Sequence, residues 1–292
     1  MRHKYAVISD SACDLPINLT QEHNIGIVPF KFSFDKVNKL TDRVDISNDE
    51  FYHCLEASGA MPKTYYPTVR DYVDSFKVHL ELEQDVMCLC MSSKLSKSYS
   101  SALSAKKILS HTYPNNKIIV VDSLSASAGQ GMLVLDAATL RDDSSEIEAA
   151  FKKLETLKKT GLIIVTVKSL EQLARGGRMS NSTAAIGTLL RINPVIYFSE
   201  GSLISKGKAF GRRKALETIK KLTIQELSGN TQSYDFVLLH TRALNEANAV
   251  AKALTADYGI TYLMPPIELG VTIGMHMGAT VVAVAFKKKL NS

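Results

Sequence analysis

The sequence predicts an α/β protein with an N-terminal, mostly parallel, Rossmann-like sheet domain and a C-terminal α+β domain with a mixed or antiparallel sheet. Two observations lead to this prediction. In residues 1–158 short apolar runs alternate with helical patterns, which is typical of a parallel sheet covered on both faces. In residues 159–292 the strands include a hairpin pattern and are interrupted by fewer helices. The 292 residues are enough for two such domains.

In the first half, each predicted strand is a short apolar run that ends in a polar loop. Thr68 and Asp71 give the start signal of a helix, because a hydroxyl followed three residues later by an acid forms a capping box. Cys88 and Cys90 alternate within one run, so they share a strand face and are expected to be buried, reduced thiols. Strands are expected at 4–8, 25–34, 85–91 and 117–122, and further helices at about 95–109 and 126–141.

The second half opens with a buried strand at 162–167 and a short helical stretch that ends in Gly-Gly-Arg. Residues 194–211 have the pattern of a hairpin that turns at Glu200–Gly201. Further strands are expected at 234–240, 260–264 and 280–286, and helices at about 212–227 and 245–258.

Composition and charge narrow the function classes. No apolar run approaches the roughly 18 residues of a membrane span, and the N-terminus reaches an acidic residue too soon for a signal peptide, so a soluble cytoplasmic protein is expected. Residues 1–158 hold 18 Lys and Arg against 21 Asp and Glu, whereas residues 159–292 hold 17 against 8. The positive charge of the second half is compatible with an acidic partner, with an anionic membrane surface, or with a role in solubility alone. Aromatic residues are not interleaved with the basic ones, which argues against nucleic-acid binding.

Three hydroxyl-rich loops directly follow predicted parallel strands, at Ser9–Ser11, Ser92–Ser96 and Asp122–Ser125. Ligands of open α/β sheets bind at the carboxyl ends of the strands, where hydroxyls and helix N–H groups suit a carboxylate or a phosphate. One such loop alone indicates only helix capping, since Ser and Asp are common N-cap residues. The sequence contains no Gly-rich nucleotide-binding motif, no nucleophile elbow and no cysteine spacing typical of a metal site.

His276 is the most suggestive of the seven histidines, because it lies between Gly274 and Gly278, just before the last apolar strand. His240 ends a strand without such surroundings, and we expect it to be structural.

Seven segments, in order along almost the whole chain, resemble the motifs of the DegV family. The opening SDSACDLP (9–16) is similar to its TDSxxDLP motif, and SSKLSKSYSSA (92–102) to its SSxLSGTYxSA motif. The others are VDSLSASAGQGMLV (121–134), LEQLARGGRMS (170–180), IGTLLRINPV (186–195), GKAFGRRKAL (207–216) and GVTIGMHMGATVVAVAF (270–286).

The resemblance implies a non-catalytic carrier of one long-chain fatty acid, of the palmitate, stearate or oleate class, in a tunnel between the two domains, with no other cofactor. It implies that Thr64, Ser93 and His276 hold the carboxylate, with Ser92, Ser125 and Arg178 in the same ligand-binding set. Some family members present the carboxylate to a separate ATP-binding kinase subunit, which forms an acyl phosphate. A partner-docking face would then comprise Lys206, Lys208, Arg212, Arg213 and Lys214, and transient contact with the membrane surface is expected. Ile186, Leu189, Leu190 and Ile192 are candidates to line the tunnel.

The chain departs from the family pattern near the expected carboxylate site. Tyr65 and Tyr66 replace small polar residues, Lys94 and Lys97 replace glycines, and Met275 and Ala279–Thr280 flank His276 where the family has other residues. These departures leave two alternatives open. One is a carrier or sensor of another anionic lipid or of a small carboxylic acid. The other is a hydrolase or phosphotransferase that depends on Ser93 and His276.

Overall fold

The computed structural model describes residues 3–58, 62–179 and 192–291, and the chain divides into two compact units. Unit 1 comprises Met1–Ser47 and Pro62–Thr160, and unit 2 comprises Asn48–Met61 and Gly161–Ser292. The sequence placed residues 48–61 in the first domain, whereas they belong to unit 2. Their partners there lie some two hundred positions further along the chain, at a separation where no local pattern could reveal them.

Unit 1 is built on a four-stranded, wholly parallel sheet with the strand order β2-β1-β6-β7. Every residue of β1 is buried, and so is every residue of β6 after the first, as expected for a sheet covered on both faces. This sheet confirms the predicted parallel architecture. The strands are β1 (Tyr5–Asp10), β2 (Ile25–Val28), β6 (Asp85–Cys90) and β7 (Ile118–Asp122).

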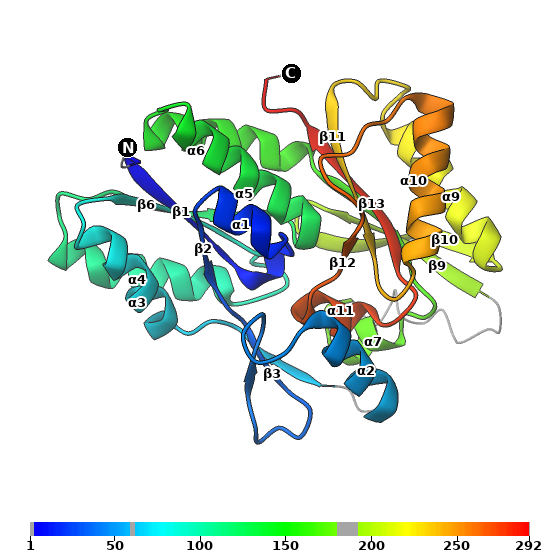
Figure 1. The fold of residues 1–292 in the computed structure, drawn as a ribbon, viewed down its shortest axis with the longest axis horizontal. Helices are drawn as coiled ribbons and strands as arrows, with labels where there is room; N and C mark the ends of the chain where they lie inside the picture. Colours follow the sequence, from blue (N-terminus) through cyan, green and yellow to red (C-terminus); the bar gives the residue numbers. More distant parts are fainter. Residues whose placement is uncertain (1–2, 59–61, 180–191, 292) are drawn as a thin grey trace. The chain divides into compact units, whose positions relative to one another are not determined.

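Helices cover both faces of this sheet (Figure 1). Helices α3 (Val69–Leu80) and α4 (Ser98–Thr112) pack on one face, where Tyr72, Phe76 and Leu109 are buried against the strands. Helices α5 (Ser127–Asp142) and α6 (Ile147–Leu157) pack on the other face. The shorter helices of unit 1 are η1 (Ser11–Cys13), α1 (Ile17–Glu22) and η2 (Lys158–Thr160).

The predicted capping box at the start of α3 is confirmed. The Thr68 hydroxyl accepts a hydrogen bond from the Asp71 amide at 3.2 Å, and the Asp71 carboxylate accepts one from the Thr68 amide at 2.7 Å.

A small antiparallel sheet in unit 1 was not predicted. Its strand order is β4-β3-β5, with β3 (Lys31–Ser33) between β4 (Leu40–Thr41) and β5 (Lys63–Tyr65). The expectation of a single strand over 25–34 was therefore wrong, because this run contributes β2 to the parallel sheet and β3 to the small one. Pro29 lies between the two strands and has no amide hydrogen to donate to a strand pairing.

Unit 2 contains a mixed six-stranded sheet with the order β10-β9-β8-β13-β11-β12. All its pairings are antiparallel except β11 with β12. The predicted hairpin is confirmed, and Glu200 and Gly201 turn it with φ angles of 48° and 79°, as a type I′ turn requires. The strands are β8 (Leu162–Thr166), β9 (Ile192–Ser199), β10 (Ser202–Phe210), β11 (Tyr234–His240), β12 (Ile267–Glu268) and β13 (Val282–Lys288).

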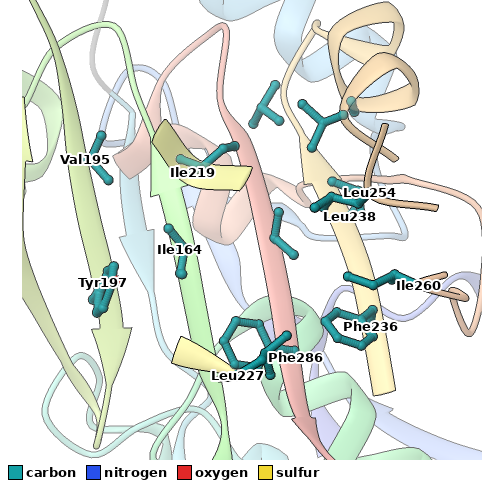
Figure 2. Packing of buried hydrophobic residues seen from close by; sticks show 14 of the residues in the cluster. Ile164, Val195, Tyr197, Ile219, Leu227, Phe236, Leu238, Leu254, Ile260 and Phe286 are labelled. Atoms are coloured by element: carbon teal, nitrogen blue, oxygen red, sulfur yellow. The ribbon is translucent and has the colours of Figure 1, made fainter. Parts of the chain in front are cut away.

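Helices α9 (Arg212–Glu226) and α10 (Leu244–Tyr258) pack on this sheet. Figure 2 shows the core that they share with it, in which Ile219 and Leu254 meet side chains of four strands, including Ile164 and Phe286. The other helices of unit 2 are α2 (Asn48–Ser58), α7 (Glu171–Arg175) and α11 (Val271–Met277).

The strand predicted at 260–264 is absent, and the edge strand β12 lies later, at Ile267–Glu268. Residues 260–264 make one backbone bond to β11, from the Leu263 amide to the Phe236 carbonyl at 3.0 Å. Their apolar character instead serves packing, since Ile260 is buried in the core and Tyr262 lies edge-on to Phe236. Among the described residues, no helix combines the length and the apolar character that crossing a bilayer demands.

Candidate ligand-binding site

The three hydroxyl-rich loops of unit 1 meet at the carboxyl edge of its parallel sheet. The Ser92 amide donates to the Ser125 carbonyl at 2.8 Å, and the Ser93 amide donates to the Asp122 carboxylate at 3.2 Å. The Ser123 amide donates to the Cys90 carbonyl at 3.1 Å, at the end of β6. These bonds fix the loops after β6 and β7 to each other, as the parallel alignment of the two strands requires.

Asp10 ties the loop after β1 to the same edge. It is fully buried, and its carboxylate accepts hydrogen bonds from the Met91 amide at 2.9 Å, the Ser98 hydroxyl at 2.6 Å and the Gln130 side-chain amide at 2.9 Å. Burial raises the pKa of Asp10, and these donors oppose that shift. Because the donors come from three different segments, Asp10 fixes the geometry of the whole edge. Its position favours a structural role over contact with a ligand.

The four predicted ligand residues of unit 1 differ in exposure. Ser92 and Ser125 are buried, and the Ser92 hydroxyl accepts a hydrogen bond from the Lys94 amide at 3.2 Å. Ser93 is exposed, so its hydroxyl is accessible to a ligand. Thr64 is half-buried in β5, where it pairs with Phe32 of β3.

The two tyrosines that depart from the family pattern have different surroundings. The Tyr65 ring lies under two lysines, with Lys39 Nζ 4.4 Å and Lys63 Nζ 5.3 Å from its centroid. Tyr66 is 43% exposed. Tyr65 is therefore held beside cationic side chains next to Thr64, whereas Tyr66 retains much of its solvent contact.

In unit 2, His276 lies on helix α11 and is partly buried. Residues 271–277 form two helical turns, which the sequence did not predict, and they end at Gly278, whose φ of 80° suits glycine. The imidazole packs against the turn after α7, where a Cβ added to Gly176 would lie 2.6 Å from His276 Nδ1. Arg178 is in the same turn and donates to the Gly176 carbonyl at 2.5 Å. The Gly-Gly-Arg motif and the last histidine therefore form one cluster.

Burial is the main cause that lowers the pKa of His276 to about 4, and the positive charge of Arg178 lowers it further. The imidazole is therefore neutral at pH 7 and can donate one hydrogen bond through its protonated nitrogen. A carboxylate bound beside His276 would raise its pKa again, because an anion favours the protonated form of histidine.

The support of α11 by α2 was not predicted from the sequence. The Tyr52 hydroxyl of α2 donates to the Leu269 carbonyl at 2.8 Å, just before α11 begins. Tyr52 is fully buried, and a Cβ on Gly274 would lie 1.8 Å from its hydroxyl oxygen. Only glycine at 274 lets the tyrosine pack here, two residues from His276. The signal in the sequence was the glycine itself, since nothing local connects it with Tyr52.

The predicted docking residues of unit 2 lie on β10 and in the first turn of α9. Lys208 and Arg213 are exposed, whereas Arg212 is partly buried and bonds to Glu246 of α10 through Nε at 2.8 Å. Lys206 Nζ lies 4.7 Å from the Tyr197 ring centroid. Three basic residues in the first turn of a helix are unfavourable, because the helix dipole is positive there.

Part of the predicted tunnel lining cannot be placed: Ile186, Leu189 and Leu190 lie outside the described residues. Ile192 begins β9 and is buried, paired with Phe210 of β10.

These features define a class of protein: a two-unit α/β protein with a parallel sheet whose carboxyl edge carries hydroxyls, and a mixed sheet with a histidine helix beside a Gly-Gly-Arg turn. A family model described as "Uncharacterised protein, DegV family" matches residues 4–289. The chain belongs to the DegV family. A DegV domain-containing protein of Clostridium perfringens is 32% identical over 289 residues, which cover 97% of each chain. One of Caldanaerobacter subterraneus is 31% identical over 288 residues, covering 98% of this chain and 99% of the relative.

Solved structures share this fold across nearly the whole chain. A stearic acid-binding protein from Eubacterium ventriosum has a TM-score of 0.92 and 27% identity, and covers 98% of this chain and 99% of its own. A DegV family protein from Thermus thermophilus, described by its fatty acid binding, has a TM-score of 0.87 and 28% identity. The match covers 98% of this chain and 100% of that protein. The fatty acid binding protein DegV from Bacillus subtilis has a TM-score of 0.85 and 26% identity. The match covers 99% of this chain and 100% of that protein. The predicted fold class and family are both confirmed.

Proposed function

We propose that this protein binds one long-chain fatty acid and acts as a cytoplasmic carrier without catalysing a reaction by itself. The observation that carries the proposal is the similarity, over at least 98% of the chain, to solved proteins described as fatty-acid-binding. Our proposal for the carboxylate is that Thr64, Ser93 and His276 donate hydrogen bonds to it. Ser92, Ser125 and Arg178 support this group from the neighbouring turns.

The chemistry of these residues supports the proposal. Hydroxyl and imidazole N–H groups are donors, and hydrogen bonds from donors to a carboxylate are stronger than those between neutral groups. Ser93 is exposed, Thr64 is half-buried, and His276 is neutral at pH 7 with one N–H to donate. For the acyl chain, each CH₂ removed from water contributes about 0.8 kcal/mol, so a long chain gains roughly 10 kcal/mol before entropy costs.

The proposal is tested by native mass spectrometry of the purified full chain, followed by organic extraction and identification of the released lipid. We expect one fatty acid per protein. Thr64→Val, Ser93→Ala and His276→Leu each remove one donor and should weaken retention by about 5- to 100-fold, which corresponds to roughly 1–3 kcal/mol. Retention is measured as the rate of transfer of labelled oleate to lipid vesicles.

Ser104→Ala is the matched control, because Ser104 is an exposed serine of α4 that bonds only to the Ser100 carbonyl within the described part of the chain. Its oleate retention should equal that of the unaltered protein. A protein that carries no lipid and takes up neither oleate nor palmitate would refute the carrier proposal. Binding that survives all three substitutions would place the carboxylate elsewhere.

We further propose that the docking residues on β10 and α9 meet an ATP-binding kinase subunit, and that basic side chains also assist transient contact with anionic membranes. The exposed Arg213 and Lys214 in the first turn of α9, which contains no acidic residue, support an acidic partner surface. Exchanging Lys208 and Lys214 for glutamate should slow acyl phosphate formation with such a kinase while leaving bound fatty acid unchanged. An unchanged rate would refute this docking face.

A further inference from the structure

A pocket of about 610 Å³ opens in unit 2 where β11 ends and α10 begins. Its lining includes His240, Arg242, Ala243, Glu246 and Glu268. None of these residues belongs to the fatty acid site proposed above. Ala243 is the N-cap of α10, and no side chain caps the helix there. The first backbone N–H groups of a helix have no partner within it, so this helix start presents donors to the pocket.

His240 supplies a second and independent indication of a ligand. It is only 6% exposed, yet it lines the pocket. Within the described residues neither ring nitrogen has a hydrogen-bond partner, and Nδ1 is buried. Because Nδ1 has almost no accessible surface, a ligand in the pocket would bond to the other ring nitrogen, Nε2.

The pocket carries charges of both signs. Glu268 accepts a hydrogen bond from the Arg242 amide at 3.2 Å, and Glu246 pairs with Arg212. The Arg242 guanidinium bonds to Asp49 of α2. A simple anion would be attracted to the helix start but repelled by the two glutamates. A simple cation would be attracted to the glutamates but repelled by the helix start and Arg242.

We propose that this pocket binds a small zwitterion with the chemistry of a free α-amino acid. Its carboxylate accepts hydrogen bonds from the first N–H groups of α10, and its ammonium group lies against Glu268. His240 forms a hydrogen bond with the ligand at the pocket wall. Burial lowers the pKa of His240, with Glu268 opposing, so the ring remains neutral near pH 7 and adds no charge to the pocket.

The test is saturation-transfer-difference NMR and calorimetry on the full chain with glycine, L-alanine, L-serine, L-glutamate and L-lysine. Acetate and methylamine are the matched comparisons, because each carries one half of the charge pattern of glycine. We expect saturable binding of at least one amino acid and much weaker binding of acetate and methylamine. Glu268→Gln should weaken the amino acid by about tenfold or more, since it removes the charged partner of the ammonium group. It retains an oxygen to accept the Arg242 amide, which protects the fold.

Lys252→Ala is the control, because Lys252 lies on α10, is exposed and does not line the pocket. Its affinity for the amino acid should equal that of the unaltered protein. His240→Phe is a second test at similar side-chain size, and it should also weaken binding. Failure of all five amino acids to bind, acetate binding as tightly as the amino acid, or an unchanged affinity in Glu268→Gln would each overturn the proposal. Fatty acid content should be unaffected by these variants, because none of them alters Thr64, Ser93 or His276, so failure here is distinguishable from failure of the carrier proposal.

Discussion

Replacing Gly274 by alanine tests whether Tyr52 fixes the helix that carries His276. The added Cβ would lie 1.8 Å from the Tyr52 hydroxyl oxygen and 2.8 Å from its ring carbon Cζ, so the buried ring must move. Overpacking costs about 1–3 kcal/mol, and loss of the bond to the Leu269 carbonyl adds about 1 kcal/mol. Alanine regains about 1 kcal/mol of helix propensity. The net destabilisation should be about 1–3 kcal/mol.

The double variant with Tyr52→Phe isolates this contact. Tyr52→Phe alone should cost about 1 kcal/mol, because it leaves the Leu269 carbonyl without its donor. In the double variant the nearest clashing atom is gone, although Cζ still lies close. The double variant should therefore be destabilised by about 1 kcal/mol less than the sum of the two single variants.

Urea unfolding followed by circular dichroism at 222 nm gives the four free energies of unfolding in this cycle. The NMR signals of the His276 ring give a second readout, because they should shift in Gly274→Ala if α11 moves. Strictly additive costs, or a neutral Gly274→Ala with unshifted His276 signals, would refute the role of Tyr52 in holding α11.

Three further predictions concern buried polar groups. Because the pKa of His276 is about 4 in the folded protein and about 6.5 in the unfolded chain, the unfolded state binds more protons between these values. Stability should be full above pH 6.5 and fall by about 1–3 kcal/mol towards pH 4, and urea titrations should show this loss diminished in His276→Gln. Asp10→Asn places an amide NH₂ among hydrogen-bond donors and should lower the free energy of unfolding by about 2–3 kcal/mol. A melting temperature equal to that of the unaltered protein would show that the hydrogen bonds of Asp10 do not stabilise the fold. Lys287, 1% exposed, pairs with Asp235 at 2.9 Å, so Lys287→Met should cost about 3 kcal/mol in urea unfolding, and adding Asp235→Leu should recover most of it.

Local sequence patterns were sufficient for most elements of the fold. The Thr68 capping box, the Glu200–Gly201 turn and the alternation of Cys88 and Cys90 depend on interactions within a few residues, and all three are present in the structure. The prediction of strands failed where the same apolar pattern was compatible with more than one structure. The apolar run 25–34 is divided at Pro29 between two sheets, and the apolar stretch around Tyr262 packs into the core without joining a strand.

The candidate site was likewise predicted from the sequence only in part. The sequence by itself determined the family and placed Ser93 after a parallel strand and His276 between glycines, because order and spacing along the chain carry that information. Only the tertiary structure decided that α2 belongs to unit 2, that Tyr52 packs on Gly274, and that His240 lines a pocket at the start of α10. These contacts join residues that are far apart in the chain, and each partner alone has an ordinary local environment. Their effect arises from burial and close packing, which exist only once the chain has folded.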